Sequence, residues 1–216
     1  MEDWDAHLER ARRRYADGES RLPDEQDARQ RQLTRMGNAA TAAGLAALML
    51  GRGDDAREWF GRAARSYRES WAGAPPDAWG RPIGAIKARL LAGDDEGVAA
   101  DASWALEVGA AESESSIGRY AATLAFCVLG DWHAARIQAD LLLLRDDFPR
   151  DVAEALAYVA VEDVVAYVEA IESVLESFEQ RDEYLEDVPV ADTVLALQAL
   201  AARRDMAAAL ESELLP

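Results

Sequence analysis

The sequence predicts an all-α fold of about ten helices arranged as an array of antiparallel pairs, either an α-solenoid or an α-α superhelix. A helix-turn-helix step occurs at Gly51, Gly93 and Gly130, where an apolar helix runs into glycine, an aspartate follows and an Ala-rich helix restarts. Apolar residues recur every three or four positions, and no alternating pattern that could build a sheet is present. Short helices joined by tight turns pack as antiparallel neighbours.

Glycine, proline and aspartate delimit the expected elements. Asp17-Gly18 closes the first helix, Asp24 caps the second, and either Gly37 or Gly44 is a place where the second could break. The clearest loop covers residues 73–76. In order, the expected helices cover residues 2–16, 24–50, 54–71, 83–92, 95–109, 116–129, 132–145, a segment that Asp151 opens, 190–203 and 206–213.

Residues 151–187 differ in character because apolar side chains recur there at alternating spacings of three and four. The members of this seam are Val161, Val164, Val168, Ile171, Leu175 and Phe178. The spacing favours helix over strand, in spite of the β-branched run. Off the seam lies an acidic stripe, interpreted as a solvated face, of Glu162, Glu169, Glu172, Glu176 and Glu179.

The charge of the chain is strongly acidic. The 216 residues include 41 acidic and 23 basic side chains, for a formal net charge of -18, and Lys87 is the one lysine. This acidic, Lys-poor, Ala-rich composition resembles that of proteins from salt-in halophiles and favours adaptation to high salt. A specific basic partner is the alternative explanation. Nucleic acid is excluded as an expected partner, because a phosphate backbone needs a basic surface.

The acidic excess is confined to one part of the chain. We expect a single helical-repeat domain over residues 1–216, in which 1–71 hold 13 basic and 13 acidic residues and 72–216 hold 10 and 28. Two interpretations stay open: the first helices are partly covered by the rest, or their arginines form a face for an acidic partner. Those arginines are Arg12, Arg13, Arg14, Arg52, Arg57, Arg62, Arg65 and Arg68.

The expected compartment is the cytoplasm. The first residues are acidic and resemble neither a secretory signal nor a transit peptide, and the apolar runs are too short to span a membrane. Cys127 is the single cysteine, so that no internal disulfide can form.

The first step resembles the tetratricopeptide repeat. Gly51, Ala56, Phe60 and Ala63 match that family's Gly, Ala, aromatic and Ala positions, where small residues let paired helices approach closely. The other two steps keep the register in part, and the resemblance covers about residues 38–145. It implies paired antiparallel helices; the glycines are 42 and 37 residues apart instead of the family's regular 34, so the family's peptide groove is not carried over.

The C-terminus carries a second resemblance. Residues 192–204, followed by the Leu214-Leu215-Pro216 tail, resemble the closing helix of an all-helical family of bacterial toxin-immunity proteins. The resemblance implies a cytoplasmic protein that binds and blocks a cognate toxin without catalysis.

The sequence contains few indications of an enzyme. The sequence has no phosphate-binding loop, no nucleophile elbow and no metalloprotease motif, and we expect no catalytic residues, no metal and no cofactor. A rival hypothesis places a pocket for a small molecule or an enzymatic substrate between helices near His133. The polar groups of that pocket would be Asp131, Trp132, His133 and Arg136.

Aromatic and arginine side chains indicate a binding surface. Trp71 and Trp79 flank the loop at 73–76, a position typical of a groove rim, although core packing is the equal alternative. Protein interfaces are enriched in aromatics and arginine. The expected partner-binding residues are Trp71, Trp79, Arg57, Arg65 and Arg68.

The leading hypothesis is a non-catalytic helical-repeat protein that binds another protein, and its most specific form is immunity to a toxin. A third hypothesis is a structural oligomer, such as a dimer, whose contact is the seam from Val161 to Phe178.

Overall fold

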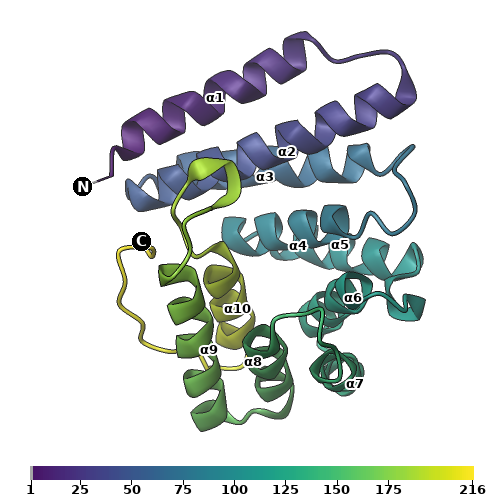
Figure 1. Ribbon diagram of the computed structural model, residues 1–216, viewed down its shortest axis with the longest axis vertical. Coiled ribbons are helices and arrows are strands. Elements are labelled where there is room, and N and C mark those ends of the chain that lie inside the picture. Colours follow the sequence, from purple (N-terminus) through teal and green to yellow (C-terminus); the bar gives the residue numbers. More distant parts are fainter. Residues whose placement is uncertain (1) are drawn as a thin grey trace. The chain divides into compact units, whose positions relative to one another are not determined.

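The computed structural model describes residues 2–216 and contains ten α-helices and two short 3-10 helices in that range, with no strand (Figure 1). The all-α prediction is therefore confirmed. The chain forms two compact units: unit 1 holds the residues up to Asp94, Asp182–Val190 and Glu213–Pro216, and unit 2 holds Asp95–Arg181 and Ala191–Ser212.

Unit 1 contains four helices, each packed against the next in the chain. They are α1 (Trp4–Ser20), α2 (Gln26–Met49), α3 (Gly53–Ser70) and α4 (Gly80–Ala92). The 3-10 helix η2 (Leu185–Asp187) returns to this unit and lies against α2. Arg14 of α1 forms an ion pair with Glu186 there, and this contact holds the returning segment in place.

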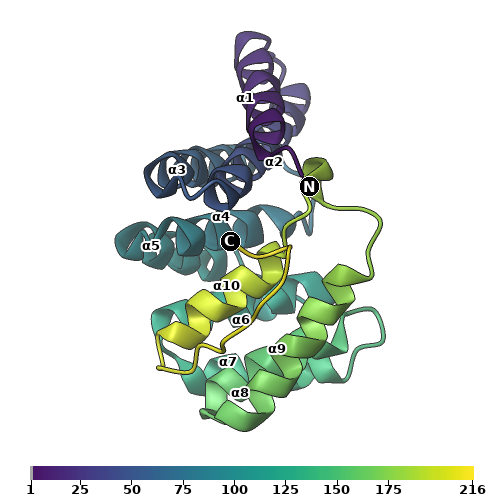
Figure 2. The same ribbon diagram turned by 90° about the vertical axis from the view of Figure 1, so that its left-hand side faces the viewer.

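Unit 2 contains six helices, of which the first five also pack in chain order. They are α5 (Asp95–Glu107), α6 (Ser116–Leu129), α7 (Trp132–Leu143), α8 (Arg150–Val161), α9 (Val164–Glu179) and α10 (Asp192–Ala202), with η1 (Ala110–Glu112) after α5. α10 packs on α8 and α9, and the extended chain that follows it runs back beside α9 (Figure 2).

The helix-ending glycines adopt the predicted backbone conformation. Gly51, Gly93 and Gly130 have φ angles of 68°, 64° and 77°, in the left-handed region. A fourth step ends α8, where Glu162 takes the same conformation with φ 60°. Asp163 then caps α9 by accepting a hydrogen bond from the Ala166 N–H at 3.1 Å. The sequence pattern missed this step because glutamate stands in place of glycine.

All four steps share one packing register. The residues five, nine and twelve positions after each step residue are at most 1% exposed. These are Ala56, Phe60, Ala63, Val98, Ala102, Ala105, Ala135, Ala139, Leu142, Tyr167, Ile171 and Val174. The register therefore survives replacement of its small residues by large ones, such as Tyr167, because neighbouring helices adjust to the added volume.

Three glycines that suggested helix ends lie inside helices. Gly18 does not close α1, which continues to Ser20, and neither Gly37 nor Gly44 breaks α2. A Cβ on Gly37 would come within 2.7 Å of the Tyr67 ring. These glycines allow side chains of a neighbouring helix to touch the backbone, and this packing requirement outweighs their low helix propensity.

The capping predictions were right in part. Asp131 caps α7 by accepting from the Ala134 N–H at 3.0 Å. Glu25, not Asp24, caps α2, and its carboxylate accepts from the N–H groups of Asp27 and Ala28. A carboxylate at either position meets the positive end of the helix dipole, so the exact residue depends on local loop geometry.

The C-terminal helix predicted at 206–213 is wrong, because that segment is not helical. Asp205 adopts a φ of 56°, which turns the chain away from α10. The Gln198 side-chain amide forms hydrogen bonds with both backbone groups of Ala208. Its Nε2 donates to the carbonyl at 2.6 Å, and its Oε1 accepts from the N–H at 3.0 Å. A side chain thus replaces the helical hydrogen bonds that the Ala-rich sequence suggested.

The seam at 151–187 is divided between two helices. Ile171, Leu175 and Phe178 are buried within unit 2, whereas Val161 and Val164 are about half exposed on either side of the Glu162 turn. Only the exposed start of the seam is accessible on the surface of this unit.

Candidate functional site

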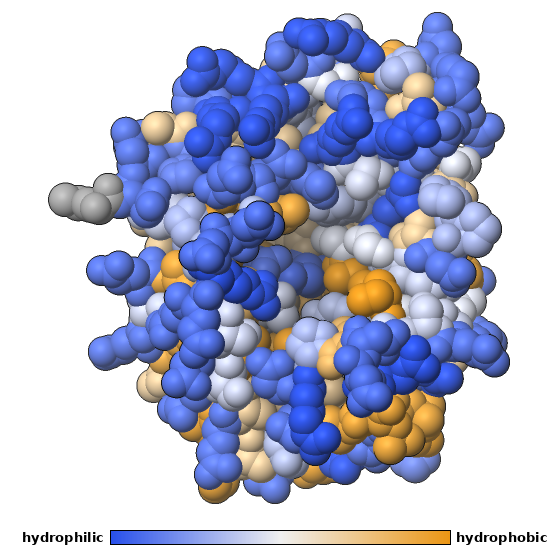
Figure 3. Space-filling model, viewed as in Figure 1, coloured by the Kyte–Doolittle hydropathy of each residue, from blue (hydrophilic) through white to orange (hydrophobic). Residues whose placement is uncertain are grey.

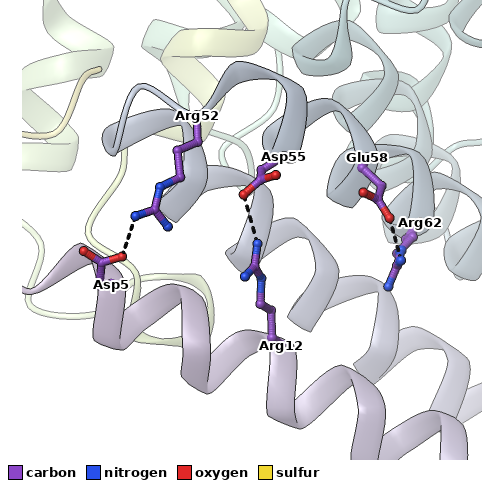
Figure 4. A network of polar contacts seen from close by, with 6 residues as sticks. All are labelled: Asp5, Arg12, Arg52, Asp55, Glu58 and Arg62. Carbon is purple, nitrogen blue, oxygen red and sulfur yellow. Dashed lines mark hydrogen bonds and ion pairs between the residues drawn. The ribbon is translucent and has the colours of Figure 1, made fainter.

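The arginines of the first helices are largely engaged by carboxylates of unit 1. Figure 4 shows three ion pairs: Arg52 with Asp5 at 2.9 Å, Arg12 with Asp55 at 3.0 Å and Arg62 with Glu58 at 2.6 Å. Two of them join α1 to α3 or to Arg52, the residue that precedes it. These pairs give arginines of the first helices carboxylate partners inside unit 1.

The expected partner-binding arginines lie in different surroundings. Arg57 pairs with Asp54 in the first turn of α3. Arg65 lines a cavity of about 400 Å³ between α1, α2 and α3, together with Tyr15 and Met36. Arg57, Arg65 and Arg68 all belong to α3, so the structure brings them onto one helix.

Trp71 and Trp79 lie together, with ring centroids 5.6 Å apart. Trp79 is buried and its Nε1 donates to Asp77 Oδ1 at 3.1 Å, while Trp71 is partly exposed at the end of α3. The two rings close the loop between α3 and α4, so that a ligand at this rim would contact Trp71 first.

The residues of the predicted His133 pocket share the start of α7 but diverge in direction. Asp131 is the helix cap, and His133 is exposed. Arg136 pairs with Asp140 at 2.8 Å. The Trp132 ring lies under the guanidinium of Arg204, 4.3 Å from its centroid. Trp132 therefore contacts the residue that follows α10 by two positions, and each of the four side chains has different surroundings.

An exposed apolar stripe follows on the same helix. Ile137, Leu141 and Leu144 stand at positions i, i+4 and i+7 and so lie on one face of the α7 end. Ile137 is 47% and Leu144 is 79% exposed. Figure 3 shows a hydrophobic patch at its lower right, over the position of α7 in Figure 1. We call these three residues the α7 stripe.

Sequence reasoning missed the α7 stripe, although a signal was present. Residues 141–144 are four consecutive leucines, and a helix cannot turn four consecutive side chains toward one core. Leu142 occupies the buried register position, twelve residues after Gly130. It follows that Leu141 and Leu144 must lie away from that core face.

A cavity of about 560 Å³, lined by several polar residues, lies elsewhere, in unit 1. Its wall is one face of α2, the loop after α3 and the start of α4. The lining residues are Asp27, Gln30, Arg31, Thr34, Arg35, Gly73, Pro75 and Arg81. No sequence motif marked this site, because Gly73, Pro75 and Arg81 are remote in the chain from the α2 residues.

The described residues hold no group of three or more His, Cys, Asp or Glu arranged for a metal ion. Cys127 is buried, and burial raises the pKa of its thiol to about 12, so the thiolate nucleophile is not formed near neutral pH. Among these residues, none of the helices has both the length and the apolar character needed to cross a membrane.

Comparison with known proteins yields no relative: no family model, no curated protein and no solved structure matches the chain.

Proposed function

We propose that this protein is a non-catalytic, tetratricopeptide-like helical-repeat protein that binds another protein through the α7 stripe. The observation that carries the proposal is the exposure of Ile137 and Leu144 on a helix whose opposite face is fully packed. Apolar side chains grouped on a helix face, flanked by charged pairs such as Arg136–Asp140, are typical of surfaces that another protein covers.

The repeat register supports the tetratricopeptide-like part of the proposal. Paired helices with a shared buried register stack into arrays, and such arrays present extended surfaces to partners. Immunity to a toxin is the most specific form of the proposal and places the protein in the cytoplasm. This form rests on the sequence resemblance of residues 192–216.

The test compares variants in which each substitution replaces an exposed apolar residue by glutamate. The partner is captured from lysate of the native host in high salt, identified, and its Kd is measured with purified proteins. Ile137→Glu/Leu144→Glu should weaken binding by about tenfold or more, because each substitution removes apolar burial worth roughly 1.5–3 kcal/mol. Val165→Glu, on α9 and 73% exposed, is the control and should bind as the wild type does.

Unchanged affinity of the double variant would overturn the assignment of the α7 stripe. Failure to recover a stoichiometric partner in repeated captures would count against protein binding itself. If the partner is a toxin, expression of the wild-type chain should restore growth of cells that produce the toxin, and the double variant should not.

A further inference from the structure

The guanidinium of Arg81 is buried beside neutral hydrogen-bond partners. The residue is only 9% exposed, yet its two hydrogen bonds go to neutral groups: Nε donates to Ser70 Oγ at 2.9 Å, and Nη2 donates to Gln30 Oε1. A guanidinium has five N–H donors. Within residues 2–216 no carboxylate pairs with Arg81, and its remaining donors belong to a residue that lines the 560 Å³ cavity.

The neighbouring side chains orient Arg81 without neutralising it. Gln30 is itself buried, and its Nε2 donates to Asp27 Oδ1 at 3.0 Å, which fixes its Oε1 toward Arg81. Asp27 is the one carboxylate in the lining, and it is already paired with Arg31. Hydrogen bonds from Gln30 and Arg31 lower the pKa of Asp27, so it stays ionised and bound to these donors.

The cavity has an excess of positive charge. Arg31, Arg35 and Arg81 line it against Asp27 alone, in a chain whose net charge is -18. Arg35 is exposed and forms no ion pair with any residue that the structure describes. Burial lowers the pKa of Arg81, which reports the cost of keeping this charge away from water. An anion would offset that cost.

We infer that this cavity binds a small molecule through an oxyanion group, a phosphate or a carboxylate, with Arg81 and Arg35 as the recognising residues. Arginine pairs such groups with two parallel hydrogen bonds. The volume of about 560 Å³ lies within the range of roughly 300–1,000 Å³ that small-molecule sites occupy. Residues of α2, the 73–75 loop and α4 line the cavity, which is open to solvent. This site is separate from the α7 stripe and does not rest on the proposed partner.

Calorimetric titration of the purified chain with inorganic phosphate, and separately with succinate, tests the inference. The titrations are run in about 0.15 M KCl, where a Debye length of about 8 Å screens the distant acidic residues. The wild type should bind at least one probe with saturation. Binding of phosphate alone points to a phosphorylated ligand, binding of succinate alone to a carboxylic acid, and both results support the site.

Three Arg→Gln variants make the test specific. Arg81→Gln should weaken binding by about tenfold or more, since it removes charge-assisted hydrogen bonds. Arg35→Gln should weaken it several-fold, and because Arg35 is exposed this variant keeps the test valid if Arg81→Gln misfolds. Arg13→Gln removes the same charge from α1, outside the cavity, and should change nothing. Absence of saturable binding to the wild type, or equal binding by all folded variants, would overturn the inference.

Discussion

Gly44 of α2 lies directly against the Phe60 ring of α3, so that a Cβ at this position would come within 2.6 Å of Phe60 Cε1. Phe60 is fully buried and occupies the aromatic position of the first repeat step. The close approach of α2 and α3 thus depends on a missing side chain at one residue and a large one at the other.

Gly44→Ala should lower the free energy of unfolding by about 1–3 kcal/mol, because the added methyl group overpacks a rigid core. The matched control is Gly61→Ala in α3, where a Cβ would meet only the flexible end of Arg65 at 3.6 Å. This control should raise the free energy by about 0.5–1 kcal/mol through helix propensity. Urea unfolding followed by circular dichroism measures both. Equal effects of the two substitutions would show that propensity, not contact, governs Gly44.

The hydroxyl of Tyr120 is buried in unit 2 and has no hydrogen-bond partner among residues 2–216. Burial raises the pKa of this phenol well above its usual value, so the group stays protonated. Tyr120→Phe should raise the free energy of unfolding by about 1 kcal/mol, since it removes a polar group that lost its water on folding. A loss of stability would reveal a partner for this hydroxyl.

Tyr167→Phe is the comparison for Tyr120→Phe, because the Tyr167 hydroxyl has a hydrogen-bond partner. The Tyr167 hydroxyl donates to Gln198 Oε1 at 2.8 Å, and Gln198 holds the extended segment at Ala208. Its removal should lower the free energy of unfolding by about 1 kcal/mol. The two substitutions delete the same atom, so their opposite signs isolate the effect of the hydrogen bond.

Arg204 binds the end of α8 to the end of α10. Its Nη1 donates to the carbonyls of Val159 and Ala160 at 2.8 and 2.7 Å, its Nε donates to Glu162 at 3.0 Å, and its guanidinium covers Trp132. These carbonyls lie in the last turn of α8, where the Val159 carbonyl also accepts from the Glu162 N–H at 3.4 Å.

Arg204→Gln should therefore lower the free energy of unfolding by about 2 kcal/mol, because it removes two charge-assisted hydrogen bonds to the part-buried Val159 and Ala160 carbonyls. Arg203→Gln is the neighbouring control, since Arg203 makes an exposed ion pair with Asp95 at 2.9 Å. The control should cost less than about 1 kcal/mol. Thermal unfolding of the two variants gives the comparison, and similar losses would mean that the carbonyl contacts contribute little.

The sequence predicted most of the helices, but it pointed neither to the Arg81 cavity nor to the α7 stripe, for a physical reason. The end of a helix is determined by a few neighbouring residues in the sequence. Gly51, Gly93 and Gly130 therefore predict helix ends to within a few residues. The helix end at Glu162 was not predicted, because glutamate does not favour the left-handed conformation that it adopts there. Gly37 and Gly44 were ambiguous because the same residue ends a helix or admits a neighbouring ring, and the neighbour is remote in sequence.

The formation of a binding cavity depends even more on residues that are distant in the sequence. Arg81 is one arginine among many in the sequence, and its role appears only when Gln30 and Ser70 are seen to bury it. The exposure of Leu144 was more predictable, because the leucine run and the buried register at Leu142 together determine it. A periodic pattern shows which face is buried, whereas a cavity requires the fold.

The acidic stripe of α9 offers a direct test of the proposed adaptation to salt. Glu169, Glu172 and Glu176 are exposed at spacings of three and four, so that Glu172 faces a like charge in both directions. Molar KCl shortens the Debye length to about 3 Å and removes such repulsion. It also weakens the ion pairs of unit 1, but residues 72–216 hold 28 acidic against 10 basic side chains, so relief of repulsion should dominate. Urea midpoints should therefore rise with KCl concentration.

Glu172→Gln should raise stability in low salt by about 0.5 kcal/mol, as two unfavourable pairs disappear, and should have almost no effect in molar KCl. Glu9→Gln on α1 is the matched control, because Glu9 pairs with Arg13 at 3.7 Å and its neutralisation should not stabilise the protein. The decisive quantity is the difference in urea midpoint between low and molar KCl for each variant. If the wild type is equally stable in both, the acidic surface is not an adaptation to salt, and an explanation through a basic partner becomes the stronger one.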